Sequence, residues 1–171
     1  PWTLPNPRID YSESGVRGVF TDTDTVDRLE KQVAKKGYLD GDDMAATFNV
    51  LRANGLIFNY VVSNWLMGEV PPAFDLLAWN DDKTRMPATM HIAYLRSYYI
   101  ENQLARGLFQ ICGQPINLTN ITSDCYVVSA ANDHIVPWRS AYATTHLVSG
   151  AARFVLSSGG HFAGIVNPPT P

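Results

Sequence analysis

Apolar residues recur every three or four positions through the first part of the chain, which is the spacing of an amphipathic helix. The pattern predicts consecutive helices over residues 24–36, 42–52, 56–66 and 87–104, with no strand between them. Asp24 or Thr25 can cap the first helix, and Pro87 suits the first turn of the last. The last helix is expected to turn one face inward, formed by Met90, Tyr94, Leu95 and Tyr98. An apolar segment at residues 74–80 precedes it.

The pattern changes after Gly113. Short apolar, β-branched runs predict strands over residues 125–130 and 153–157, with a helix at 140–148 between them. This order forms a βαβ unit, whose two strands run parallel. Residues 1–15 are rich in proline and polar side chains, and we expect an irregular lead-in there. The predicted division is therefore a lead-in at 1–15, a helical segment at 16–112 and an α/β segment at 113–171.

An acid follows the first of these two strands, and a histidine follows the second. Asp133 lies in the sequence NDHIVPW, and His161 lies in GGHF. Parallel strands end at the same edge of a sheet, so we expect the side chains of Asp133 and His161 to meet there. Acid and then histidine is the order of the last two triad members in α/β-hydrolases. This order predicts the C-terminal part of an α/β-hydrolase core, preceded by a helical cap over the active site.

The third triad member, the nucleophile, is missing from the pattern. No G-x-S-x-G or G-x-C-x-G sequence occurs between Pro1 and Pro171. We therefore expect the chain to be the C-terminal part of a larger enzyme whose nucleophile lies upstream. Cys112 and Cys125 do not match this motif, lack metal-ligand spacing and are too few for a disulfide scaffold. We expect both to be buried, unreactive thiols.

Composition narrows the class of partner. The chain has 171 residues, of which 46% are hydrophobic, and a net charge of −3, which argues against nucleic acid as a partner. The longest apolar stretch, residues 56–67, is too short and too polar for a transmembrane segment. No metal site is predicted, since no His, Cys or carboxylate residues have ligand spacing. His91 and His146 fall in predicted helices, and we expect both to be structural.

Four stretches of the sequence closely resemble the poly(3-hydroxyalkanoate) synthases, the polyester polymerases of bacterial storage granules. They are residues 59–62, 72–80, 133–138 and 160–169. The resemblance covers about residues 10–169, whereas residues 1–8 do not look like the family's sequence. It implies an acyltransferase that polymerises (R)-3-hydroxyacyl-coenzyme A, in particular 3-hydroxybutyryl-coenzyme A, into polyester with release of coenzyme A. The resemblance implies no metal or redox cofactor.

The resemblance also implies roles for the acid and the histidine. His161 would activate a cysteine upstream of this chain, because imidazole exchanges protons near neutral pH. Asp133 would hold the tautomer of that imidazole and stabilise its charged form, although an Asx turn is the structural alternative for this residue. Either residue could deprotonate the 3-hydroxyl of the next monomer. His134 could support the site or serve only the loop.

The family resemblance further implies a cytoplasmic protein at the polyester granule surface, forming a homodimer through the cap. Phe58, Tyr60 and Trp65 fit either contact with polyester or another subunit, or a place in the core. Two other functions fit the same residues. One is an esterase or polyester depolymerase of the α/β-hydrolase fold, and the other is a non-catalytic granule-associated protein. A cysteine in the upstream elbow would favour the synthase, whereas a serine would leave hydrolysis open.

Overall fold

The computed structural model describes residues 1–13, 15, 18, 21–51, 57–70, 82–161 and 166. The chain splits into two compact units, one of Pro1–Asp27 with Ala93–Pro171 and one of Arg28–Ile92. Residues 71–81, which contain the predicted apolar segment and one of the family-like stretches, lie outside the described residues. The same holds for most of the stretch after His161.

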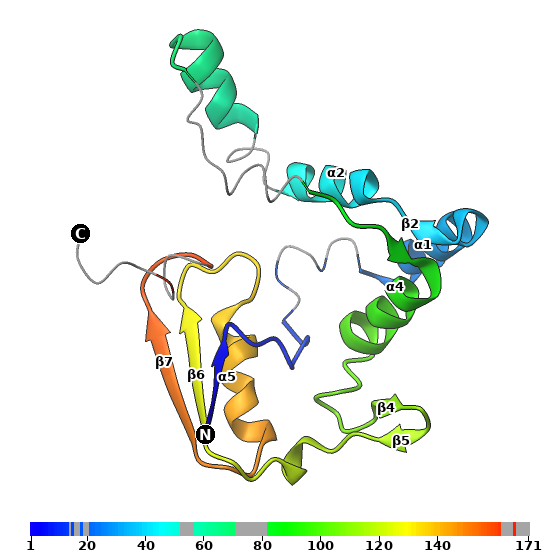
Figure 1. Ribbon diagram of the computed structural model, residues 1–171, viewed down its shortest axis with the longest axis vertical. Helices are drawn as coiled ribbons and strands as arrows, with labels where there is room; N and C mark the ends of the chain where they lie inside the picture. The colour runs from blue at the N-terminus through cyan, green and yellow to red at the C-terminus, as the bar shows by residue number, and fades with distance from the viewer. Residues whose placement is uncertain are drawn as a thin grey trace. The chain divides into compact units, whose positions relative to one another are not determined.

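A three-stranded parallel sheet organises the first unit (Figure 1). Strand β6 (Cys125–Ala130) lies in the middle, between β1 (Trp2–Pro5) and β7 (Ala152–Ser157). Both pairings are parallel, with Cys125 opposite Trp2 on one side and opposite Ala152 on the other. The strands predicted at 125–130 and 153–157 are confirmed, and so is their parallel arrangement.

Strand β1 corrects the expectation for the first residues. The irregular lead-in predicted at 1–15 is wrong at Trp2–Pro5, which pair with β6. Trp2 and Leu4 pack against the core, while the alternate residues of the strand are exposed. Pro5 is tolerated because β1 is an edge strand of this sheet, where the missing N–H costs no ladder hydrogen bond. The prediction missed this strand because Pro1 and Pro5 flank its short alternation of apolar residues, Trp2 and Leu4.

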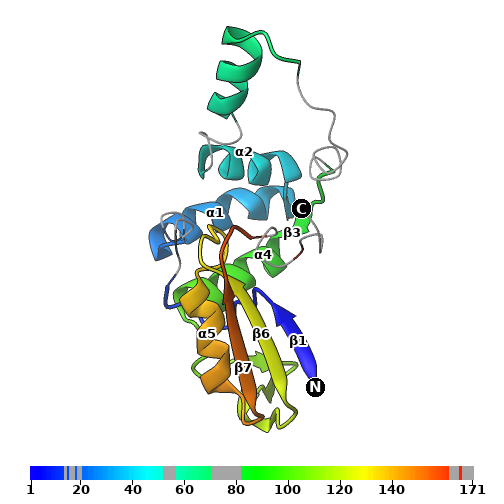
Figure 2. The ribbon, with the colours of Figure 1, turned by 90° about the vertical axis from the view of Figure 1, so that its left-hand side faces the viewer.

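Helix α5 (Trp138–Leu147) covers one face of the sheet, as Figures 1 and 2 show. Its Ala141 is fully buried and belongs to one apolar cluster with Cys125 and Val127 of β6. Removing a side chain of valine size from water stabilises a fold by about 1.5–3 kcal/mol. The helix predicted at 140–148 is confirmed, and it begins directly after Pro137, which has a non-helical ψ of 130°.

The opposite face of the sheet is less covered. Tyr126 is 39% exposed there, and Val128 and Val155 are half-buried. Because side chains alternate along a strand, these residues point away from the face that contacts α5. Parallel sheets usually carry helices on both faces.

The second unit is mainly helical. Its elements are the greater part of α1 (Thr23–Lys36), β2 (Tyr38–Leu39), α2 (Gly41–Leu51), the π-type helix η3 (Val61–Leu66), β3 (Met86–Pro87) and the start of α4 (Ala88–Tyr94). The helices predicted at 24–36 and 42–52 are confirmed. The expectation of no strand between the helices is wrong, because β2 and β3 form a short antiparallel pair.

The residue that caps the start of α1 is not one of the two predicted from the helical pattern. Asp22 Oδ1 accepts a hydrogen bond from the backbone N–H of Thr25 at 2.9 Å, and Oδ2 accepts one from the Thr25 hydroxyl at 2.6 Å. Thr25 is thus the donor in both contacts. Asp22, rather than Asp24 or Thr25, satisfies the first turn of the helix.

The helix predicted at 87–104 is shorter and changes its winding. After Tyr94 the chain continues as a π-type helix, η4 (Leu95–Ile100). Tyr99 of η4 is buried, whereas Met90 of α4, which was predicted to face inward, is 59% exposed. Asn102 adopts a left-handed conformation, with φ of 48°, and the helix ends before this residue.

The two cysteines lie in different environments. Cys125 is 4% exposed, whereas Cys112 is exposed. The expectation that both are buried is wrong for Cys112, because this residue lies at the tip of a hairpin between β4 (Gln110–Ile111) and β5 (Gln114–Pro115). Cys112 has φ of 50° and Gly113 has φ of 75°. Two positive φ angles in a two-residue loop are typical of a type I′ turn.

We expect a maleimide to modify Cys112 rapidly in the folded chain, and Cys125 only after unfolding. The reason is access, since the buried Cys125 side chain must leave its apolar cluster before the reagent can reach the sulfur. Mass spectrometry of digests taken along a time course measures both rates. A Cys112→Ser variant should lose the fast phase, and comparable rates at the two cysteines would contradict the prediction.

Gly150 lies at the close approach between the chain entering β7 and the chain entering β6. A Cβ at this position would lie 2.1 Å from the carbonyl oxygen of Ser123. We expect Gly150→Ala to destabilise the fold by about 1–3 kcal/mol through overpacking. Calorimetry should show a lower melting temperature. Gly160→Ala is the control, because an added Cβ there meets nothing within 4 Å, and an equal loss in both variants would contradict the steric argument.

Candidate active site

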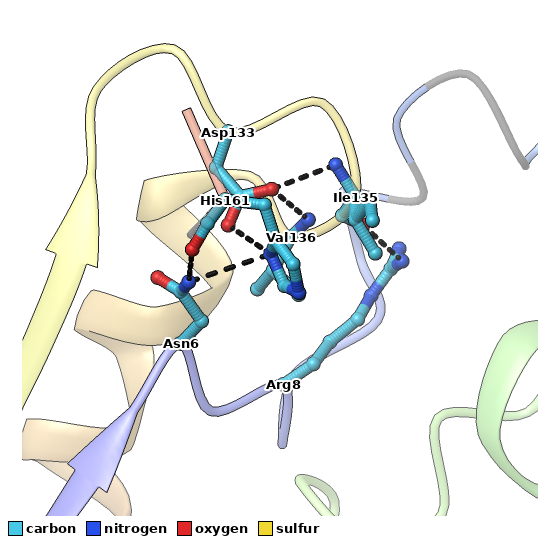
Figure 3. Close-up of polar contacts among 6 residues, drawn as sticks. All are labelled: Asn6, Arg8, Asp133, Ile135, Val136 and His161. Carbon is cyan, nitrogen blue, oxygen red and sulfur yellow. Dashed lines mark hydrogen bonds and ion pairs between the residues drawn. The ribbon is translucent and has the colours of Figure 1, made fainter. Parts of the chain in front are cut away.

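Asp133 and His161 meet at the carboxyl edge of the parallel sheet (Figure 3). Asp133 Oδ2 lies 2.7 Å from His161 Nδ1. Asp133 comes after β6 and His161 after β7, and the two loops stay paired because Asn132 N–H donates to the carbonyl of Gly159 at 2.9 Å. The predicted convergence of the two side chains is confirmed.

The carboxylate of Asp133 has a contact on each oxygen. Oδ1 accepts hydrogen bonds from the backbone N–H groups of Ile135 at 2.7 Å and Val136 at 2.9 Å, and Oδ2 faces the imidazole. The turn considered as an alternative to a site role is thus present, and it directs the second oxygen at His161. An ionised carboxylate only accepts hydrogen bonds, so with Asp133 in that form the contact requires the proton on Nδ1.

Burial differs between the two partners. The Asp133 side chain is 0% exposed, whereas that of His161 is 23% exposed. With its Nδ1 protonated, an imidazole accepts a further proton only at Nε2. A buried carboxylate behind a partly exposed imidazole is the arrangement of the acid and base in nucleophilic triads.

Two residues of the segment after β1 lie beside this pair: Asn6 contacts His161, and Arg8 contacts the loop that carries Asp133 (Figure 3). Asn6 Nδ2 donates to the backbone carbonyl of His161 at 2.7 Å and lies 3.4 Å from His161 Nδ1. Arg8 Nη1 donates to the backbone carbonyl of Ile135 at 3.2 Å. The sequence pattern missed both residues because they fall in the expected lead-in. The signal that could have placed them is the alternation of Trp2 and Leu4, which predicts a strand ending just before Asn6.

Arg8 also lies against a cluster of tyrosines. Its guanidinium carbon is 4.6 Å from the ring centroid of Tyr11 and 5.0 Å from that of Tyr99. The hydroxyl groups of Tyr11 and Tyr94 are 3.0 Å apart. Burial raises the pKa of both Tyr11 and Tyr94 above that of a free tyrosine, so both stay neutral near pH 7. Arg8 therefore contacts neutral aromatic rings, which attract a cation through their faces.

The other histidines lie in different surroundings. His134, beside the acid, is exposed. His91 Nδ1 lies 3.2 Å from the sulfur of Met86, and burial lowers the pKa of His91. His146 is exposed on α5, with its ring 5.0 Å from that of Tyr142. The structural roles of His91 and His146 stay predictions.

The aromatic stretch at residues 58–65 is exposed at two of its three rings. Phe58 is 57% exposed and Trp65 is 83% exposed, so a place in the core is wrong for both. Contact with polyester or another subunit stays a prediction.

Within the described part of the chain, no helix has the length and apolar character needed to cross a membrane. The described residues also hold no group of three or more His, Cys, Asp or Glu that could bind a metal ion.

Curated polyester polymerases match the chain over nearly its whole length. It is 42% identical over 98% of its residues to the poly(3-hydroxyalkanoate) polymerase subunit PhaC of Rhizobium meliloti. It is 41% identical over 98% to that of Cupriavidus necator, and 39% identical over 99% to the poly(3-hydroxyalkanoate) polymerase of Methylorubrum extorquens. The chain is a relative of the poly(3-hydroxyalkanoate) polymerases. It spans only 27–29% of the length of these three proteins. No family model matches it.

The expectation that residues 1–8 differ from the family stays a prediction. A match over 99% of the chain leaves only a few residues outside the alignment. Asn6 and Arg8 therefore fall within the part of the chain that aligns with a polymerase.

Proposed function

We propose that Asp133 and His161 are the acid and the base of a Cys-His-Asp triad in a poly(3-hydroxyalkanoate) synthase. The cysteine would come from a part of the protein outside this chain. The observation that carries the proposal is the 2.7 Å contact between Asp133 Oδ2 and His161 Nδ1, in a chain related to polyester polymerases. The whole protein would transfer hydroxyacyl groups from coenzyme A thioesters to a growing polyester.

The first half of the reaction would load the cysteine. His161 Nε2 accepts the thiol proton, and the thiolate attacks the thioester carbonyl of (R)-3-hydroxyacyl-coenzyme A. When the tetrahedral intermediate collapses, its bond to the sulfur of coenzyme A breaks. That sulfur takes the proton back from His161, and coenzyme A leaves as a thiol. The buried carboxylate of Asp133 stabilises the imidazolium that exists between these two proton transfers.

The second half would extend the polyester. The 3-hydroxyl of the next monomer attacks the acyl-cysteine, so that an ester bond forms and the bond to cysteine breaks. We assign His161 as the base for this hydroxyl. Asp133 is less suited, because its side chain is 0% exposed and its oxygens already accept from two backbone N–H groups and the imidazole. The cysteine sulfur recovers its proton from His161.

The larger fold that we propose is an α/β-hydrolase, with residues 113–171 in the C-terminal part of its core and residues 16–112 as the cap. The acid and histidine after neighbouring parallel strands support it, as does the half-covered face around Tyr126. Strand β1 would belong to the same core. The complete protein would act as a homodimer, formed through the cap, at the surface of cytoplasmic polyester granules. The reaction as proposed needs no metal or redox cofactor.

Incubation of the complete protein with (R)-3-hydroxybutyryl-coenzyme A tests this function. We expect release of free coenzyme A, measured with a thiol reagent, together with insoluble polyester of matching monomer content. Release of coenzyme A with free 3-hydroxybutyrate in place of polymer would instead indicate a hydrolase. Absence of turnover in folded protein would reject the enzyme and favour a non-catalytic granule protein.

A further inference from the structure

We propose that Asn6 and Arg8 are positioning residues for the Asp133–His161 pair. Asn6 acts through the backbone carbonyl of His161, and Arg8 acts through the backbone carbonyl of Ile135. Both lie in the short segment that leaves β1 and passes the end of β6 (Figure 3). The catalytic meaning of this role rests on the proposed function, whereas the geometry can be tested without it.

The amide of Asn6 has only one favourable orientation. Its Nδ2 donates to the carbonyl oxygen of His161 at 2.7 Å. Turning the amide by 180° would set Oδ1 against that oxygen, and two acceptors repel at this distance. The backbone N–H of Asn6 donates to the carbonyl of Val128 at 2.8 Å, which anchors the residue to β6. Asn6 thus ties the loop after β7 to the end of the sheet.

Two further features mark Asn6 as a specialised position. Its φ is 44°, a left-handed conformation that asparagine tolerates better than most residues. Its Oδ1 is buried, and the described residues provide no hydrogen-bond partner for it. An unsatisfied buried acceptor costs stability, so an apolar side chain would serve a purely structural role better. The donor on Nδ2 is the group that this position supplies to His161.

Arg8 holds the loop that carries Asp133, as Asn6 holds the loop that carries His161. Its Nη1 donates to the carbonyl of Ile135 at 3.2 Å, and its Nη2 donates to the carbonyl of Glu13 at 3.0 Å. Ile135 in turn provides one of the two N–H groups that hold Asp133 Oδ1. Stacking on Tyr11 and Tyr99 fixes the plane of the guanidinium. A lysine at this position would keep the charge but lose the planar fork that reaches two carbonyls at once.

The experiment follows the imidazole proton rather than turnover. In the complete protein labelled with ¹⁵N-histidine, the Nδ1–H signal of His161 is identified by its loss in His161→Gln. Asn6→Gly removes the amide but keeps the left-handed backbone accessible, and Arg8→Lys keeps the charge but removes the planar guanidinium. We expect each change to speed exchange of the Nδ1 proton by roughly three- to tenfold, the ratio expected for one lost hydrogen bond. The fraction of the Nε2–H tautomer should rise in parallel.

Two matched controls remove the same groups elsewhere. Asn117 caps the short helix η5 (Leu118–Asn120), and Arg139 stacks on Trp138 at 4.8 Å. Asn117→Gly and Arg139→Lys should leave the His161 signal unchanged. If Asn6→Gly does not fold, Asn6→Asp keeps the size and backbone but sets an oxygen against the carbonyl of His161, and should displace the signal.

Unchanged exchange and tautomer in the Asn6 and Arg8 variants would overturn the positioning role, as would equal changes in the controls. The proposed function would survive that result, because the readout does not depend on turnover. Conversely, an altered His161 signal in a protein that does not release coenzyme A would reject the proposed function and leave the positioning role in place.

Discussion

Replacing His161 by alanine in the complete protein should reduce release of coenzyme A from (R)-3-hydroxybutyryl-coenzyme A by about 10²–10⁴-fold, the usual contribution of a general acid–base group. The loss is large because the same imidazole would act in both halves of the reaction. It would take the proton from the thiol and later from the 3-hydroxyl. Initial rates at equal concentrations of folded protein measure the effect.

His134→Ala is the matched control for this experiment. The His134 side chain is exposed and is adjacent in sequence to Asp133, so its loss tests the neighbourhood of the acid without removing the base. We expect a much smaller reduction in rate. Near-normal turnover in His161→Ala would refute the proposed role of His161 as the base. Equal collapse in both variants would show that His134 shares the role.

Replacing Asp133 by asparagine should reduce turnover by up to about 10⁴-fold, the size of loss seen for this change in a serine-protease triad. The Asn side chain would keep its oxygen on the N–H groups of Ile135 and Val136. Its NH₂ group would then replace Oδ2 opposite His161 Nδ1. A donor there forces Nδ1 to accept and places the ring proton on Nε2. In that tautomer His161 cannot take a proton from the nucleophile.

Asp124→Asn serves as the control for the acid. Asp124 is exposed and directly precedes β6, at the opposite end of that strand from Asp133. We expect its replacement to leave both turnover and the His161 tautomer unchanged. Turnover of Asp133→Asn within tenfold of wild type, with the ring proton still on Nδ1, would refute the assigned role of the carboxylate.

Local patterns predicted the elements whose stability is decided nearby. Helices α1, α2 and α5 have apolar residues at helical spacing, and β6 and β7 are short β-branched runs. For α5, β6 and β7, the apolar cluster joins Ala141, Val127 and Phe154, which all belong to one βαβ unit. Winding was less predictable. The pattern predicted neither the π-type winding of η4 nor the burial of Tyr99 within it.

The contact between Asp133 and His161 could be predicted from the sequence because of the topology of the sheet. One helix separates two strands, so the strands run parallel and both loops emerge at the same edge. The sequence could not predict which groups would hold the carboxylate and the imidazole in place. The two N–H groups on Asp133 depend on the conformation of the loop after β6.

By itself, the sequence determined the positions of Asp133 and His161, the strands that carry them and the resemblance to polyester polymerases, because each depends on residues that are consecutive in the chain. Only the tertiary structure brought Asn6 and Arg8 to the site and left Cys112 exposed. Strand β1 pairs with β6, whose residues lie far along the chain, and register between distant strands leaves no local periodic signal. Contacts made through such a pairing become visible only once the sheet has formed.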